Sequence, residues 1–313
     1  MPETANILVV GSVNMDLVMR ARRLPVPGET VFGRDFTITP GGKGANQAVA
    51  AARLGANCSL IGRIGSDSFG QILLEELESE EIDCRGVSIT TEHPTGVAMI
   101  LVDMKGENAI VVDGGANRLV NADDDIFPNA ELFEKANVVL LQLELSLSLT
   151  RAAIDQARRH NCKVILDPAP APSYLPDELC AVDVLSPNIV EAEQITGLKI
   201  GEERIDKNMA TDLIARGAKA VVAKLGHRGS LVVTADGQFR RVPPYKVNIV
   251  NTTGAGDAFT AALAVAIGEG QGLPDAARFA NAAGAVACTR HGAIASMPTR
   301  KEVLALMAEQ EDI

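Results

Sequence analysis

The 313-residue sequence lacks the patterns that mark several large classes of protein. No apolar run approaches the length of about 18 residues that a membrane span needs, and the N-terminus carries no basic segment of a secretory signal. We therefore expect neither a membrane span nor export, and we expect a cytoplasmic protein. The net charge of -11 repels phosphate backbones, so nucleic acid is not an expected partner.

Cysteine and histidine are too scattered for a metal site. The five cysteines include no Cys-x-x-Cys pair, and the four histidines show no metal-ligand spacing. The cysteines are Cys58, Cys84, Cys162, Cys180 and Cys288. We interpret them as reduced, mostly buried residues, and we expect no disulfide framework.

Two nucleotide-binding fingerprints are also missing. The chain contains no G-x-x-x-x-G-K-[ST] phosphate loop. After an expected first strand at residues 7–10, it continues as Gly-Ser-Val-Asn-Met-Asp over residues 11–16, without G-x-G-x-x-G. This absence counts against a dinucleotide-dependent oxidoreductase, which is one alternative for a chain of this size.

What the sequence does contain is an alternation of short apolar runs with helical patterns. Expected strands cover residues 7–10, 58–61, 138–141, 164–166, 182–185, 221–223, 231–233 and 245–250. Expected helices end at Leu54 or cover residues 68–79, 147–160, 258–267, 275–289 and 300–309. The alternation predicts an α/β fold with three layers, α/β/α, and a Rossmann-like, mostly parallel sheet.

Two stretches lie outside this alternation. Residues 30–39 follow a Pro/Gly break and favour β structure, while residues 96–102 and 108–112 predict a hairpin. We expect inserted segments near residues 14–40 and 95–113 to form a small β-sheet lid. The whole chain, residues 1–313, would then be a single domain with this appendage.

The stretch at residues 251–259 is the first functional candidate. Gly254 and Gly256 allow the backbone to approach a ligand closely, and an expected helix begins there. The helix dipole favours an anion at that position, and the Asp257 carboxylate could take a proton from a hydroxyl that attacks a phosphate. The alternative is that Asp257 only caps the helix.

A second glycine-rich stretch, at residues 40–48, also leads into a helix and includes Asn46. The alternative there is a flexible loop.

Asn14 and Asp16 share one face if their segment is extended, and an amide beside a carboxylate suits a polyol; an Asx turn is the alternative.

Polar residues also follow several expected strands, where ligands of such sheets bind. Gln142, Glu144 and Asp16 favour a sugar site. Asn188, Glu191 and the glycine loop at residues 224–229 favour a site for a nucleotide and magnesium.

The motif Gly-Gly-Lys-Gly-Ala-Asn-Gln-Ala at residues 41–48 and the motif Thr-Gly-Ala-Gly-Asp at residues 253–257 resemble the two signatures of the ribokinase-type carbohydrate kinases. Residues 11–16, 24–30, 167–171 and 187–193 resemble further segments of that family. The resemblance spans nearly the whole chain. It implies ATP-dependent phosphorylation of D-ribose at the 5-hydroxyl, and a homodimer formed through the lid.

The resemblance also assigns roles to residues. Asp257 would be the general base, with the backbone of Gly254, Ala255 and Gly256 as the anion hole. The sugar site would comprise Asn14, Asp16, Gly42, Lys43, Asn46, Glu144 and Asp257. The ATP site would comprise Asn188, Lys224, Leu225, Gly226, His227, Arg228, Gly229, Gly256 and Asn281.

Two metal ions are implied as well. Glu191 would act on Mg²⁺ indirectly. The K⁺ ligands would come from Asn251, Thr253, Ala287, Arg290, Gly292 and Ser296. The family usually has Asp at the position of Asn251, so we expect K⁺ to bind more weakly here.

Other departures and alternatives stay open. Lys224 stands where the family often has Thr, which leaves the local ATP contacts open. Another furanose or a nucleoside, such as deoxyribose or adenosine, could replace ribose as the substrate. A sugar-binding regulator without catalysis is a further alternative, against which Asp257 and its two neighbouring glycines count.

Overall fold

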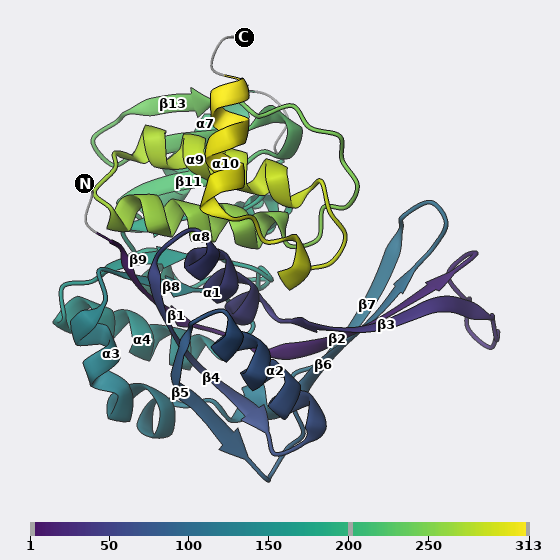
Figure 1. Ribbon diagram of the computed structural model, residues 1–313. Helices are drawn as coiled ribbons and strands as arrows, with labels where there is room; N and C mark the ends of the chain where they lie inside the picture. The colour runs from purple at the N-terminus through teal and green to yellow at the C-terminus, as the bar shows by residue number, and fades with distance from the viewer. Residues whose placement is uncertain (1–3, 200–202, 311–313) are drawn as a thin grey trace.

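The computed structural model describes residues 4–199 and 203–310, and within them a large, mostly parallel sheet lies between two layers of helices (Figure 1). Across the sheet, the strands are β13 (Phe239–Val242), β12 (Ser230–Thr234), β11 (Ala220–Lys224), β10 (Val184–Leu185), β9 (Lys163–Leu166), β8 (Val138–Leu141), β1 (Asn6–Val10), β4 (Asn57–Gly65) and β5 (Asp83–Thr90). Neighbours from β11 to β5 run parallel, while β12 and β13 are antiparallel additions at one edge. The expected three-layer α/β/α fold is confirmed.

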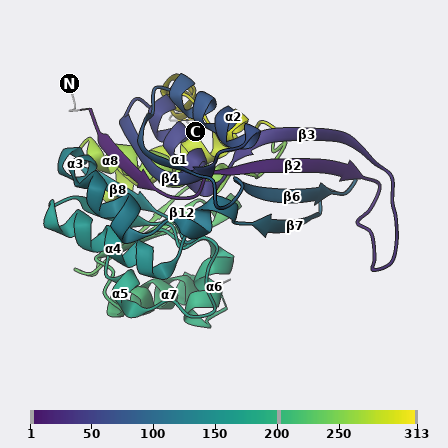
Figure 2. The ribbon, with the colours of Figure 1, turned by 90° about the horizontal axis from the view of Figure 1, so that it is seen from below.

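Helices cover both faces of the sheet because its central strands are apolar on both sides. In β1, Ile7 and Val9 belong to one core cluster and Leu8 and Val10 to the other, as the two-residue period of a strand requires. One face packs against α1 (Lys43–Arg53), α2 (Ser68–Ser79), α8 (Ala255–Gly268), α9 (Leu273–Ala287) and α10 (Arg300–Glu309). The other face packs against α3 (Ala130–Lys135), α4 (Leu147–Arg159), α5 (Asp177–Cys180), α6 (Ile189–Thr196) and α7 (Glu203–Ala215) (Figure 2). Among the described residues, none of the helices has both the length and the apolar character needed to cross a bilayer.

A second, four-stranded sheet projects from the body of the molecule (Figures 1 and 2). Its strands are, in order, β3 (Gly33–Gly41), β2 (Asn14–Ala21), β6 (Gly96–Val102) and β7 (Asn108–Asp113). Only residues 11–13 separate β1 from β2, so the chain passes directly from the large sheet into the small one. The expected small sheet is confirmed, and the segments near residues 14–40 and 95–113 contribute its strands.

One expected strand is wrong. Residues 245–250 form no strand, because β13 already lies at the sheet edge and Pro243 and Pro244 follow it without an N–H to donate. The segment runs instead to the end of α9, where the Val250 N–H donates to the Cys288 carbonyl at 2.8 Å. The sequence analysis also misses β5, β13, α3 and α5, whose segments are short or polar, and α7, although Met209 and Leu213 of α7 have the four-residue spacing of a helix face.

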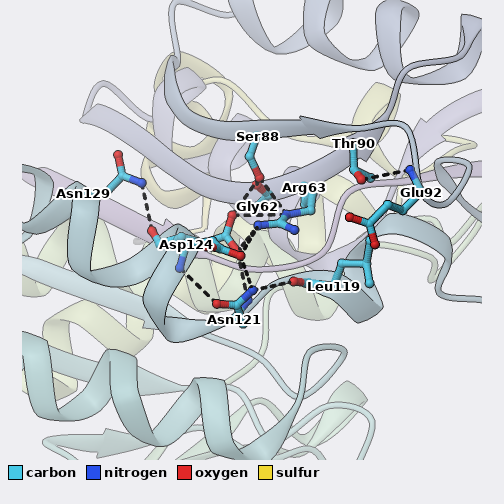
Figure 3. A network of polar contacts seen from close by, with 10 residues as sticks. Gly62, Arg63, Ser88, Thr90, Glu92, Leu119, Asn121, Asp124 and Asn129 are labelled. Carbon is cyan, nitrogen blue, oxygen red and sulfur yellow. Dashed lines mark hydrogen bonds and ion pairs between the residues drawn. The ribbon is translucent and has the colours of Figure 1, made fainter.

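A buried ion pair fastens the chain beyond β7 to the edge of the large sheet (Figure 3). Arg63 Nη2 on β4 donates to Asp125 Oδ2 at 2.7 Å, and Ser88 Oγ on β5 donates to Asp125 Oδ1 at 2.7 Å. The Asn121 N–H donates to the same carboxylate at 2.9 Å, and Asn129 Nδ2 donates to the Asp125 carbonyl at 2.8 Å. These bonds hold the segment that follows the short 3₁₀ helix η1 (Gly115–Leu119).

Candidate active site

Asp257 lies in the first turn of α8 and is almost fully buried. The helix is capped by Gly254, whose φ of 78° lies in the left-handed region that favours glycine. A Cβ atom at Gly254 would also lie 2.7 Å from Met297 Cε. Because a first helical turn leaves N–H groups without helical partners and the helix dipole adds positive potential, residues 254–256 can stabilise an anion beside Asp257.

Two amides from α1 orient the Asp257 carboxylate. Asn46 Nδ2 donates to Oδ2 at 2.8 Å, and Gln47 Nε2 donates to Oδ1 at 3.0 Å. Each carboxylate oxygen keeps a further acceptor position, so Asp257 can still take a proton from a hydroxyl. Asn46 Oδ1 is buried and has no protein donor in the described residues, which leaves an acceptor beside Asp257 for a ligand hydroxyl.

Asp16 lies on β2 against the end of β3. A Cβ atom at Gly41 would lie 2.4 Å from Asp16 Oδ2, so a larger residue there would displace the Asp16 carboxylate. Burial, followed by the negative charges of Glu144 and Asp257, raises the pKa of Asp16 to about 7. The Asp16 carboxylate is therefore poorly solvated, and hydroxyl donors from a ligand would stabilise its ionised form.

Glu144 and Lys43 lie near Asp16 and belong to the same group of polar residues. Glu144 accepts hydrogen bonds from Ser12 Oγ and from the Lys43 N–H, the latter at 3.1 Å. Gly42, just before α1, has a φ of 90°, and a Cβ atom there would lie 2.7 Å from the Asn14 nitrogen. The negative charge of Asp257 raises the pKa of the Lys43 ammonium, and burial opposes this effect. Lys43 therefore stays protonated beside these carboxylates.

Asn117 is a site residue that no sequence pattern indicates. Asn117 Nδ2 donates to Asn14 Oδ1 at 2.8 Å and to the Val13 carbonyl at 3.0 Å. Asn117 Oδ1 accepts from the Val13 N–H at 2.9 Å. Because Asn117 lies on η1, it fixes Asn14 at the junction of the two sheets from a segment far away in the sequence.

A cavity of ≈ 470 Å³ borders the N-terminus of α8, where Ala255 and Gly256 are part of its lining. Its lining includes these residues of the expected nucleotide site: Lys224, Gly226, His227, Gly229, Gly256 and Asn281. Leu225 packs into the core instead, and Asn188 and Arg228 are not part of the lining. Residues 244–247 and Ile249 form much of the remaining wall, which places the segment wrongly expected as a strand beside the cavity.

The chain matches the description "pfkB family carbohydrate kinase" over residues 4–300. It is 37% identical to the ribokinase of Haemophilus influenzae over 95% of this chain and 97% of that protein, and 36% identical to that of Mus musculus over 96% and 94%. A solved structure of Arabidopsis thaliana ribokinase complexed with ribose and ATP superposes with a TM-score of 0.91 at 34% identity, covering 97% of this chain and 99% of that one. The chain belongs to the pfkB family of carbohydrate kinases. Asp257, the polar residues around Asp16 and Glu144, and the cavity are therefore the candidate active site of a carbohydrate kinase.

In this kinase Asn188 and Glu191 form a closed pair at the start of α6. The Asn188 N–H and Asn188 Nδ2 each donate to one Glu191 carboxylate oxygen at 2.7 Å, and the Glu191 N–H donates back to Asn188 Oδ1 at 2.9 Å. Burial raises the pKa of Glu191, opposed by the positive charge of Lys224. Within residues 4–199 and 203–310, no group of three or more His, Cys, Asp or Glu side chains is arranged to hold a metal ion.

The residues expected to bind K⁺ come from two segments that the kinase brings together at the end of α9. The Asn251 N–H donates to the Cys288 carbonyl at 3.2 Å, which joins the segment before α8 to the one after α9. Asn251 Oδ1 accepts from the Thr253 N–H at 2.7 Å, and Ser296 Oγ donates to the Ala293 carbonyl at 2.8 Å. The hydroxyl oxygen of Ser296 keeps its lone pairs, and the expected set of carbonyl and hydroxyl oxygens suits a hard cation.

Proposed function

We propose that this kinase transfers the γ-phosphoryl group of ATP to the 5-hydroxyl of D-ribose, giving ribose 5-phosphate and ADP. The observation that carries the proposal is the position of Asp257. It lies in the first turn of α8, near the polar residues Asp16 and Glu144, and the neighbouring Gly256 lines a cavity of ≈ 470 Å³. The similarity to ribokinases, one of them solved with ribose and ATP, supports the same substrates.

The transfer follows from this geometry. Asp257 accepts the proton of the 5-hydroxyl as that oxygen attacks the γ-phosphorus, and the bond from the γ-phosphorus to the ADP oxygen breaks. The N–H groups of residues 254–256 stabilise the negative charge on the transferring phosphoryl group. The ammonium of Lys43 offsets the local carboxylates while the sugar and the phosphate approach each other.

Sugar selection in this proposal depends on Asp16. A sugar whose hydroxyls donate to Asp16 offsets the poor solvation of its carboxylate, whereas a sugar without the matching hydroxyl leaves that carboxylate unpaired. Ribose should therefore exceed 2-deoxyribose in kcat/KM if the 2-hydroxyl is a donor. ADP release measured with ribose, deoxyribose, fructose and adenosine tests this choice. If another of these compounds gives the highest kcat/KM, that compound and not ribose is the substrate.

Two metal ions are part of the proposal. Mg²⁺ would neutralise charge on the ATP phosphates, and Glu191, whose oxygens are both engaged by Asn188, would act on it through water rather than as a direct ligand. K⁺ would occupy the oxygen-rich site around Asn251 and Ser296 and shape the loop that precedes α8.

The small sheet would act as a lid on the sugar and as a dimer contact. Asn14 and Asp16 lie on its strand β2, so movement of this sheet would open or close the sugar pocket. Within the described part of the chain, its outer strands β3 and β7 each pair on one side only. Their exposed apolar residues include Phe36, Ile38, Ile110, Val111 and Val112. Pairing with a second copy would cover these edges and apolar side chains.

A further inference from the structure

A buried ion pair lies directly behind the candidate active site. Lys224 Nζ at the end of β11 donates to Asp167 Oδ1 after β9 at 2.7 Å. The exposed fractions of the two side chains are 11% and 2%. Lys224 Nζ also donates to Thr260 Oγ1 on α8 at 3.3 Å, so the pair joins two strands of the large sheet to the helix that carries Asp257.

One amide connects this ion pair to Asp257. Gln47 Nε2 donates to Asp167 Oδ2 at 3.2 Å and to Asp257 Oδ1 at 3.0 Å, so its two hydrogens serve two carboxylates. The orientation of the amide is fixed from the other end, because Gln47 Oε1 accepts from Gln142 Nε2 at 2.6 Å. Asp167 and Gln142 therefore hold, from its two ends, the amide that orients Asp257.

A buried ion pair of this kind contributes little to the free energy of unfolding. Removing two charges from water costs about as much as their attraction returns, and apolar replacements of buried pairs are often neutral or stabilising. Without Lys224, however, the charge of Asp167 would face that of Asp257 across a single amide. Other charged groups near this point are Lys43, Asp16, Glu144 and Glu191, and carboxylates outnumber cations among them.

We propose that Lys224 and Asp167 form a positioning unit that, through Gln47, holds the Asp257 carboxylate in the orientation needed for proton abstraction. Lys224 neutralises Asp167, so that two carboxylates can share the Gln47 amide without repelling each other. The inference rests on the proposed role of Asp257 as the base. It differs from a role of Lys224 in binding ATP, although Lys224 also lines the cavity.

The test compares Lys224→Met, Asp167→Asn and the double variant. Lys224→Met leaves Asp167 charged and unpaired, so kcat should fall roughly 10–100-fold, as for other small displacements of a reacting group, with the KM values for sugar and ATP nearly unchanged. In the double variant the charge is gone, and the amide that replaces the Asp167 carboxylate can still accept from Gln47. Most of the lost kcat should therefore return. Gln47→Leu, which removes the link itself, should lower kcat in the same way.

Lys219→Met is the matched control. Lys219 precedes the same strand β11 at its other end and pairs with Asp183 at 2.8 Å, but its side chain is exposed. This control should keep the wild-type kcat.

Two results would overturn the proposal. If the double variant has the same low kcat as Lys224→Met and a raised KM for ATP, the role of Lys224 is to bind the nucleotide. Wild-type kcat in all variants, together with a lower melting temperature, would make the pair purely structural. All rates are measured on a sugar that the wild type phosphorylates, so failure with ribose would reject only the proposed substrate.

Discussion

The protonation state of Asp16 should make sugar affinity depend on pH. Burial and the charges of Glu144 and Asp257 raise the pKa of Asp16 to about 7. In the proposed sugar site, ligand hydroxyls would donate to the ionised carboxylate of Asp16, so the sugar should bind the deprotonated enzyme better. Lowering the pH through this pKa therefore converts Asp16 to the form that binds poorly.

The expected magnitude follows from the ionised fraction. With a pKa of about 7, that fraction changes roughly tenfold between about pH 8 and about pH 6, and ribose affinity should fall by the same factor. Ribose binding at the lower pH should also release close to one proton per sugar, whereas at the higher pH it should release almost none.

Isothermal titration calorimetry of ribose without nucleotide measures both quantities, because ATP does not contribute its own ionisation. Repeating each titration in two buffers with different ionisation enthalpies gives the number of protons released. Asp16→Asn is the matched control; it should bind ribose more weakly and with almost no pH dependence. Equal ribose affinity of the wild type at both pH values, or proton uptake on binding, would refute this account of Asp16.

Three other predictions concern the metal site, the lid and stability. Asn251→Asp should lower the half-activating K⁺ concentration about tenfold, because a carboxylate adds a negative charge that an amide lacks. Titrating both proteins with KCl against choline chloride at constant ionic strength measures this concentration. An unchanged or higher half-activating concentration in Asn251→Asp rejects the prediction. The wild type should have a dimeric mass by light scattering at micromolar concentration, and a fully active monomer would disprove the lid contact. Folding raises the pKa of Asp16 from 3.8 to about 7, so the stability this group contributes is present at low pH and is lost as pH rises through that window. The melting temperature of the wild type minus that of Asp16→Asn should therefore decrease between about pH 5 and about pH 8. The decrease should correspond to a few kcal/mol of unfolding free energy at most, and a difference that stays constant with pH would contradict this prediction.

The sequence predicts the fold well where a local pattern decides the structure. Short apolar runs identify most strands of the large sheet, since a strand buried on both faces needs no polar alternation. The same rule fails at residues 245–250, where the apolar pattern is present but Pro243, Pro244 and the sheet edge leave no partner strand. Whether a partner exists is a property of the assembled sheet.

In the candidate active site, too, local sequence patterns identify some residues, and only the tertiary structure identifies others. The glycine motifs place Asp257 and Asn46 at helix starts, and the structure brings them within 2.8 Å of each other. The contacts of Asn117 with Asn14 and of Lys224 with Asp167 join residues separated by 103 and 57 positions. No local pattern contains such pairs, so only the tertiary structure reveals them.

The most direct test of the central claim is the turnover of Asp257→Asn with ribose and MgATP. The asparagine keeps the size of the side chain and an acceptor for one of the two α1 amides, but it cannot take the hydroxyl proton. ADP release should show a kcat lower by roughly 10²–10⁴-fold, while calorimetry shows ribose affinity close to that of the wild type. A kcat near the wild-type value would contradict the assignment of Asp257 as the base.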